Sequence, residues 1–195
     1  MRITALATHI AFAAAGLLAT AAHAAPATYA IDPTHTFATF EIEHFGTTTN
    51  RARFDKKSGT VEFDKAGKAG KVEVSLDMTS VNSGTPAFNK HLQSADIFNA
   101  EKFPASKFVS DKFVFDGDKL KEVTGQLTIK DQTHPVSFKA NRFNCYDSPM
   151  LQKREVCGGD FEATIDRTQW GVDYGTGYGF PKQVRLVLQI EAVKQ

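Results

Sequence analysis

Polar and apolar residues alternate along most of the chain from residue 36 onward. A period of two places successive side chains on opposite faces of a β-strand. The runs are about ten residues long and end in turn residues, such as the Gly-rich stretch 66–70. This pattern predicts eight strands, near residues 36–45, 51–64, 72–78, 106–115, 120–129, 134–144, 161–165 and 184–192.

One face of each predicted strand is apolar and is expected to point inward. In the third strand, for example, Leu76 lies on the inner face and Ser75 on the outer one. The predicted inner residues include Ala38, Phe40, Ile42, His44, Val61, Phe63, Val72, Val74, Leu76, Met78, Phe108, Val123, Leu127, Ile129, Val136, Phe138, Phe161, Ala163, Ile165, Val184, Leu186, Leu188, Ile190 and Ala192.

The alternation stops between the third and fourth strands. Thr85-Pro86 is typical of a helix N-cap followed by Pro at the first helical position, and Phe88 and Leu92 then share a helical face. We expect a second helical turn over residues 94–99, ended by the Pro at position 104. The fold class indicated is all-β: an eight-stranded antiparallel barrel with a short helical insertion. A two-sheet sandwich is the alternative.

The first 24 residues have the pattern of a signal peptide. Arg2 is their only charged residue, an apolar run follows, and Ala22-His23-Ala24 fits the small-x-small cleavage site. We expect cleavage after Ala24, export, and a single domain over residues 25–195. The apolar run is shorter than the roughly 20 residues that span a bilayer, so the protein is not expected to be membrane-spanning.

Charge and aromatic content narrow the function classes. Without the leader, basic and acidic residues are equal in number, so nothing favours nucleic acid as a partner. The 16 Phe residues, against four Tyr and one Trp, suit a dry interior. Cys145 and Cys157 both follow the leader, and an oxidising compartment favours a disulfide between them.

The motifs of common enzymes and metal sites are absent from the sequence. No His-Glu-x-x-His or Gly-x-Ser-x-Gly pattern occurs, so we predict no catalytic residue, metal site or cofactor. His44 is the histidine of interest, because it ends the inner face of its strand. The Gly- and aromatic-rich segment 170–180 lacks a phosphate-loop pattern and is interpreted as a lip over the barrel mouth.

An ordered set of segments resembles the YceI-like family of exported, lipocalin-like barrels. Together they are distributed through almost all of the mature chain, from residue 29 to residue 171. They are residues 29–36 (YAIDPTHT), 40–44 (FEIEH), 80–82 (SVN), 91–98 (HLQSADIF), 103–104 (FP), 125–129 (GQLTI), 133–136 (THPV) and 166–171 (DRTQWG). Lys130-Asp131 departs from the Gly that the family often has at this turn, and the Cys pair lies outside the pattern.

The resemblance implies a protein that binds a polyisoprenoid lipid, such as a polyprenol or an isoprenoid quinone, in the periplasm. The ligand is expected to insert its tail among the inner-face residues, with His44 and Tyr174 near its head. The predicted ligand-binding residues are Phe40, Ile42, His44, Leu76, Phe108, Leu127, Phe138, Trp170, Tyr174 and Leu188.

Two alternatives stay open at this point. One is an enzyme that modifies a lipid or amide, with His44 or His35 as the base. The other is a barrel with a filled core that binds a protein on its surface. The sequence does not distinguish a monomer from a homodimer.

Overall fold

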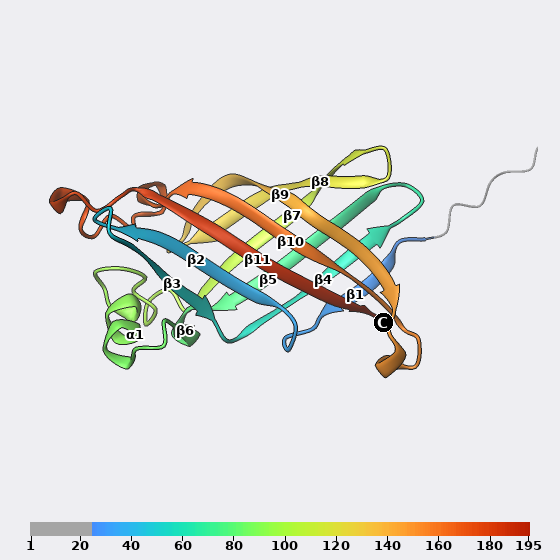
Figure 1. Ribbon diagram of the computed structural model, residues 1–195, viewed down its shortest axis with the longest axis horizontal. Coiled ribbons are helices and arrows are strands. Elements are labelled where there is room, and N and C mark those ends of the chain that lie inside the picture. The colour runs from blue at the N-terminus through green and yellow to red at the C-terminus, as the bar shows by residue number, and fades with distance from the viewer. Residues whose placement is uncertain (1–24) are drawn as a thin grey trace, which may run out of the picture.

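The structure, a computed structural model, describes residues 25–195. The predicted signal peptide lies outside the described residues. Eight strand positions form a closed antiparallel barrel, as predicted from the alternation (Figure 1). The ring consists, in order, of β1 (Ala27–Ile31), β4 (Lys57–Asp64), β5 (Ala69–Asp77), β7 (Ala105–Asp116), β8 (Lys119–Ile129), β9 (Gln132–Asp147), β10 (Glu155–Asp166) and β11 (Gln183–Lys194), and β11 pairs with β1.

Three of the eight positions are occupied by strands that are broken in two. β2 (Phe37–His44) continues β1 along β11, β3 (Thr48–Phe54) continues β4, and β6 (Val81–Asn82) continues β5. The prediction of one strand over residues 51–64 is therefore wrong at Asp55 and Lys56. There the backbone N–H groups donate to the carbonyl and the hydroxyl of Ser80 instead of continuing the ladder.

The predicted alternation of faces is correct for the inner residues named from the sequence, but it shifts by one residue at the bulges of β7 and β9. Phe40, Leu127 and Phe138 are buried, whereas their chain neighbours Lys139 and Gln126 are exposed. The buried residues form two clusters, a larger one that includes Phe40 and Trp170 and a smaller one around Tyr29 and Phe63. Both clusters lie inside the barrel, one toward each end.

A β-bulge alters the register of β7. The pairing with β8 shifts between Val109 and Lys112, so Phe108 and Phe113 both face inward although they are five residues apart. Gly125 faces this bulge on β8. A Cβ there would lie 2.3 Å from the carbonyl oxygen of Val109, so only glycine allows the close approach.

The helical insertion lies between β6 and β7 at one end of the barrel (Figure 1). Its helix, α1 (Pro86–Gln93), begins at the predicted Thr85-Pro86 step, and Leu92 is buried in the large cluster. The Thr85 side chain makes no capping bond. The prediction of a second helical turn over 94–99 is wrong, since the chain turns away at Ser94 in an extended conformation and forms hydrogen-bonded turns.

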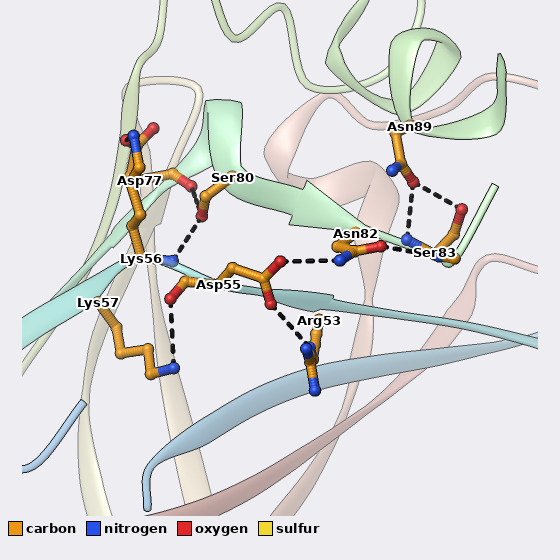
Figure 2. Close-up of polar contacts among 10 residues, drawn as sticks. Arg53, Asp55, Lys56, Lys57, Asp77, Ser80, Asn82, Ser83 and Asn89 are labelled. Carbon is orange, nitrogen blue, oxygen red and sulfur yellow. Dashed lines mark hydrogen bonds and ion pairs between the residues drawn. The ribbon is translucent and has the colours of Figure 1, made fainter. Parts of the chain in front are cut away.

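Polar side chains attach this insertion to the barrel where the strands break (Figure 2). The Asp55 carboxylate accepts from the Asn82 amide at 2.8 Å and from Arg53 Nε at 2.7 Å. Asn89 on α1 accepts from the N–H of Ser83 at 2.7 Å. The break in the strands thus fixes the position of the helix.

The opposite end of the barrel is closed by short connections and by a disulfide. Cys145 and Cys157 occupy paired positions on β9 and β10 and are bonded to each other. The C-terminus also lies at this end (Figure 1). None of the helices in residues 25–195 has the length and apolar character needed to cross a membrane.

The two faces of β9 predict unequal effects of the same substitution. Phe138→Ser should lower the free energy of unfolding by about 3–5 kcal/mol, because it removes a buried ring and leaves a cavity. Lys139→Ser, on the exposed face, should change it by less than about 1 kcal/mol. Urea titration of both variants tests the register, and equal losses would contradict it.

Candidate functional site

An elongated cavity of about 410 Å³ extends from one end of the barrel interior toward the other. This volume lies within the range of roughly 300–1,000 Å³ that is typical of small-molecule sites. Eleven of the 16 phenylalanines of the chain line it, which explains the lopsided aromatic composition. The cavity, and not a filled core, is therefore the candidate site.

All ten residues predicted to bind a ligand lie on the wall of this cavity. The strands contribute Phe40, Ile42, His44, Leu76, Phe108, Leu127, Phe138 and Leu188, and the segment after β10 contributes Trp170 and Tyr174. Their placement follows from the alternation of faces in β2, β5, β7, β8, β9 and β11. It makes them candidates for contact with a ligand.

The half of the cavity nearer the disulfide, which we call the deep half, includes residues that the sequence pattern did not assign to the site. They are Tyr29, Val61, Phe63, Val72, Val74, Phe113, Leu120, Phe143, Cys157 and Ile190. Several of them, such as Val61 and Phe63, were predicted to face inward. The alternation of polar and apolar residues is therefore the signal that could have assigned them to the site. Tyr29 and Phe113 were missed because one lies on the unpredicted strand β1 and the other follows the β7 bulge.

The deep end is sealed by a buried tyrosine that bonds to a glutamate. The Tyr29 hydroxyl donates to Glu155 at 2.6 Å, and burial and this carboxylate raise the pKa of Tyr29 well above its ordinary range. The same hydrogen bond, with help from Lys65 and Lys194, lowers the pKa of Glu155. The phenol therefore stays uncharged and closes this end of the cavity.

The other end is the mouth, because the cavity-lining residues there are partly exposed. His44 and Tyr174 are exposed, and Tyr174 retains 47% of its accessible surface, whereas Tyr29 and Phe63 at the deep end retain 2% and 5%. Asn50 and His91 also line the mouth. These four side chains offer hydrogen-bond donors and acceptors next to an apolar bore.

The segment 170–180, interpreted from the sequence as a lip, belongs to the loop between β10 and β11 at the mouth; we use the name lip for residues 171–181, which follow the buried Trp170. Tyr174 packs edge-on against His91 of α1, with ring centroids 4.8 Å apart. Phe180 packs in the same manner against His44 at 5.4 Å and Phe45 at 5.0 Å. The lip is thus held on one side by the helix and on the other by the β2–β3 turn.

Arg167 holds the lip in shape. Its buried guanidinium donates to the carbonyl oxygens of Val172 at 2.7 Å, Tyr174 at 2.9 Å and Pro181 at 3.0 Å. Burial lowers the pKa of Arg167, yet arginine remains protonated in proteins. The sequence places Arg167 within a family motif but indicates no role for it, since only the folded loop brings these carbonyls to it.

Trp170 fixes the base of the lip. It is 1% exposed, and its indole N–H donates to the carbonyl oxygen of Leu127 on β8 at 2.9 Å. The ring also packs edge-on against His134 at 5.0 Å. Its place on the cavity wall is therefore set by bonds to the barrel.

No carboxylate lines the cavity within the described residues, and Arg167 is its only charged lining residue. A cationic ligand would find no counter-charge there. His35, one of the two candidate bases, is exposed outside the cavity and bonds to Asp32 at 2.7 Å, which raises the pKa of the imidazole. His44 contacts two phenylalanine rings, and no carboxylate bonds to it in residues 25–195.

The described residues contain one cluster with potential metal ligands, formed by Cys145, Glu155 and Cys157. Both sulfur atoms belong to the disulfide, so neither is available as a thiolate. The cluster offers only the Glu155 carboxylate, which already accepts from Tyr29. It is therefore a structural element of the closed end.

Comparisons with known proteins agree with this geometry. Residues 29–192 match the YceI-like domain. Protein YceI of Escherichia coli O157:H7 is 34% identical over 184 residues, covering 93% of this chain and 94% of that protein. Protein YceI of Salmonella arizonae is 33% identical over 187 residues, covering 94% and 96%.

Two solved structures share the fold. BcnA of Burkholderia cenocepacia superposes with a TM-score of 0.67 at 22% identity, covering 83% of this chain and 98% of that one. A polyisoprenoid binding domain from Saccharophagus degradans superposes with a TM-score of 0.64 at 14% identity, covering 87% and 99%.

The contacts of Arg167 predict that Arg167→Met loosens the lip. Three backbone carbonyls would lose a charged donor, each such bond being worth about 1.5–3 kcal/mol. Amide hydrogen exchange across residues 171–181 should become faster. Arg185→Met is the matched control, since Arg185 pairs with Glu41 and Glu162 on the barrel exterior. Unchanged exchange in the lip of the Arg167 variant would contradict its role.

Proposed function

Since this chain belongs to the YceI-like family, we propose that it binds a long polyisoprenoid lipid, such as a polyprenol or an isoprenoid quinone, in the barrel interior. The observation that carries the proposal is the elongated cavity, lined by aromatic and aliphatic side chains and partly open at one end. The domain from Saccharophagus degradans, which shares the fold, is described as polyisoprenoid binding.

The distribution of polar groups orients the ligand. The tail enters the bore, where Leu76, Phe138 and Leu188 lie on the wall, and the head stays at the mouth. An apolar chain gains by burial, whereas a polar head buried without partners would lose its hydrogen bonds to water. Only the mouth offers the head both hydrogen-bond partners and access to solvent.

The energetics favour a long chain. Burying about fifteen carbons at ~0.8 kcal/mol each gives on the order of 12 kcal/mol. Association and ordering cost roughly 4–15 kcal/mol, so a short tail would bind weakly. The proposal therefore requires the chain to reach the deep half of the cavity, toward Phe63 and Phe143.

The lining chemistry also limits the head group. Asn50, His91 and Tyr174 supply donors at the mouth, and no carboxylate of the described residues repels an acceptor there. Quinone carbonyls and a polyprenol hydroxyl both suit such donors. We infer a neutral head with oxygen acceptors.

The predicted signal peptide supports a periplasmic location for this activity, where a water-insoluble lipid would need a carrier. The cavity disfavours the alternative of a filled barrel. For the alternative of an enzyme, His35 is outside the cavity and His44 has aromatic neighbours, so no observation favours it over binding.

Filling the bore tests the proposal. Ubiquinone or a polyprenol at about 100 times Kd should stabilise the protein by about 2.7 kcal/mol, which corresponds to a rise in Tm of roughly 5–10 °C. Leu76→Trp should fold and lose this response, because the larger ring occupies the space of the tail. Leu188→Trp serves as a second variant, and Lys139→Trp places the same ring on the barrel exterior as a control.

Two results would count against it. If neither lipid raises the Tm of the unmodified protein, the proposed ligand class is wrong. If both inward Trp variants fold and respond as the unmodified protein does, the lipid does not occupy the bore.

A further inference from the structure

The mouth end of the barrel carries an exposed aromatic rim, which we define as Phe45, Tyr174 and Tyr178. Phe45 is 54% exposed and Tyr178 is 83% exposed. Phe45 belongs to the β2–β3 turn, whereas the two tyrosines belong to the lip. Side chains from two separate loops thus present rings to solvent around one opening.

The loops hold these rings outward. Phe45 has a φ of 51°, a left-handed conformation that is uncommon for a bulky residue, and its ring packs against Phe180. Tyr178 lies on a short 3-10 turn flanked by Gly175 and Gly179, both of positive φ. Neither Phe45 nor Tyr178 lines the cavity, so cavity formation does not account for their exposure.

The charge around the mouth is balanced. The loops at residues 83–104, 130–131 and 171–182 contain four lysines and four carboxylates. The lysines are Lys90, Lys102, Lys130 and Lys182, and the acidic residues are Asp96, Glu101, Asp131 and Asp173. A surface with equal numbers of both signs gives little attraction to a strongly anionic partner. Exposed Tyr and Phe with balanced charge suit the interface of a neutral bilayer, where amphipathic rings sit at headgroup level.

The rim is continuous with the opening of the cavity. Tyr174 belongs to both, and Phe180 joins the rim residue Phe45 to the cavity residue His44. A polyisoprenoid tail that crossed from a membrane to this opening through water would lose its apolar surroundings on the way. Direct contact between the rim and a bilayer removes that step.

We propose that the aromatic rim docks on a neutral phospholipid surface, so that lipid passes between bilayer and cavity during contact. This inference rests on the proposed function for the transferred lipid, but the docking itself requires no ligand. Transfer is then limited by collision with a membrane and not by release of lipid into water.

The first experiment measures docking without any ligand. The protein is mixed with phosphatidylcholine vesicles, and the bound fraction is measured by flotation. The double variant Phe45→Ser/Tyr178→Ser should bind about tenfold more weakly, since two partly buried aromatic rings are lost. Met150→Ser is the matched control, because Met150 is 88% exposed at the opposite end.

Docking through the rim is overturned if the unmodified protein and the double variant bind vesicles equally well. It is also overturned if Met150→Ser weakens binding as much as the double variant does, or if the unmodified protein does not bind. If the rim instead joins two copies of the chain, the double variant would shift a dimer to a monomer in sedimentation and leave vesicle binding unchanged. That result would also overturn the proposal.

The second experiment measures transfer of ubiquinone from loaded protein to phosphatidylcholine vesicles. The rate should rise in proportion to vesicle concentration and fall about tenfold in the double variant. The rise in Tm with ubiquinone should stay unchanged in the single variant Tyr178→Ser, because Tyr178 is 83% exposed and does not line the cavity. A rate independent of vesicle concentration would overturn transfer by contact.

Failure of ubiquinone to bind would contradict the proposed function, whereas docking would still be decided by flotation, which needs no ligand.

Discussion

The pairing of β11 with β1 closes the sheet, and the rest of the structure depends on this seam. Tyr29, Ala30 and Ile31 pair with Lys194, Val193 and Ala192. Beside the seam, the carbonyl oxygen of Glu191 accepts from the N–H of Asp32 at 2.9 Å and from the hydroxyl of the fully buried Thr36 at 3.1 Å. Once the ring is closed, the sheet has one inner face, and every apolar residue of the alternation must share the same interior.

Eight strands leave an interior that side chains can fill or that can hold one small ligand. In this barrel the strand breaks and the difference between the two ends favour an interior that can hold a ligand. Tyr29 and Glu155 seal one end, while the break at Asp55 and Ser80 directs the chain into the helical insertion at the other. The helix and the lip then frame the mouth, and Arg167 fixes the shape of the lip. The result is a bore with one dry end and one polar end.

The sequence predicted the inner faces well, because a closed barrel keeps strict alternation wherever its strands run undisturbed. That is why all ten predicted site residues line the cavity and why α1 begins at Pro86. The prediction failed where tertiary contacts override local pattern. The first strand segment is only five residues long, the Ser80 hydrogen bonds break the second strand, and the β7 bulge changes which residues face inward. No local sequence pattern indicates the role of Arg167 or the aromatic contacts of His44 and His91, because these contacts form only when the chain folds.

The central claim is that the bore holds an isoprenoid lipid, and mass spectrometry of organic extracts tests it most directly. The full chain should be expressed in an exporting bacterium, purified from the soluble exported fraction without detergent, and extracted with organic solvent. The account predicts a long-chain isoprenoid quinone or polyprenol at about one molecule per barrel. Extracts that contain no lipid, or only lipids without an isoprenoid chain, would contradict it.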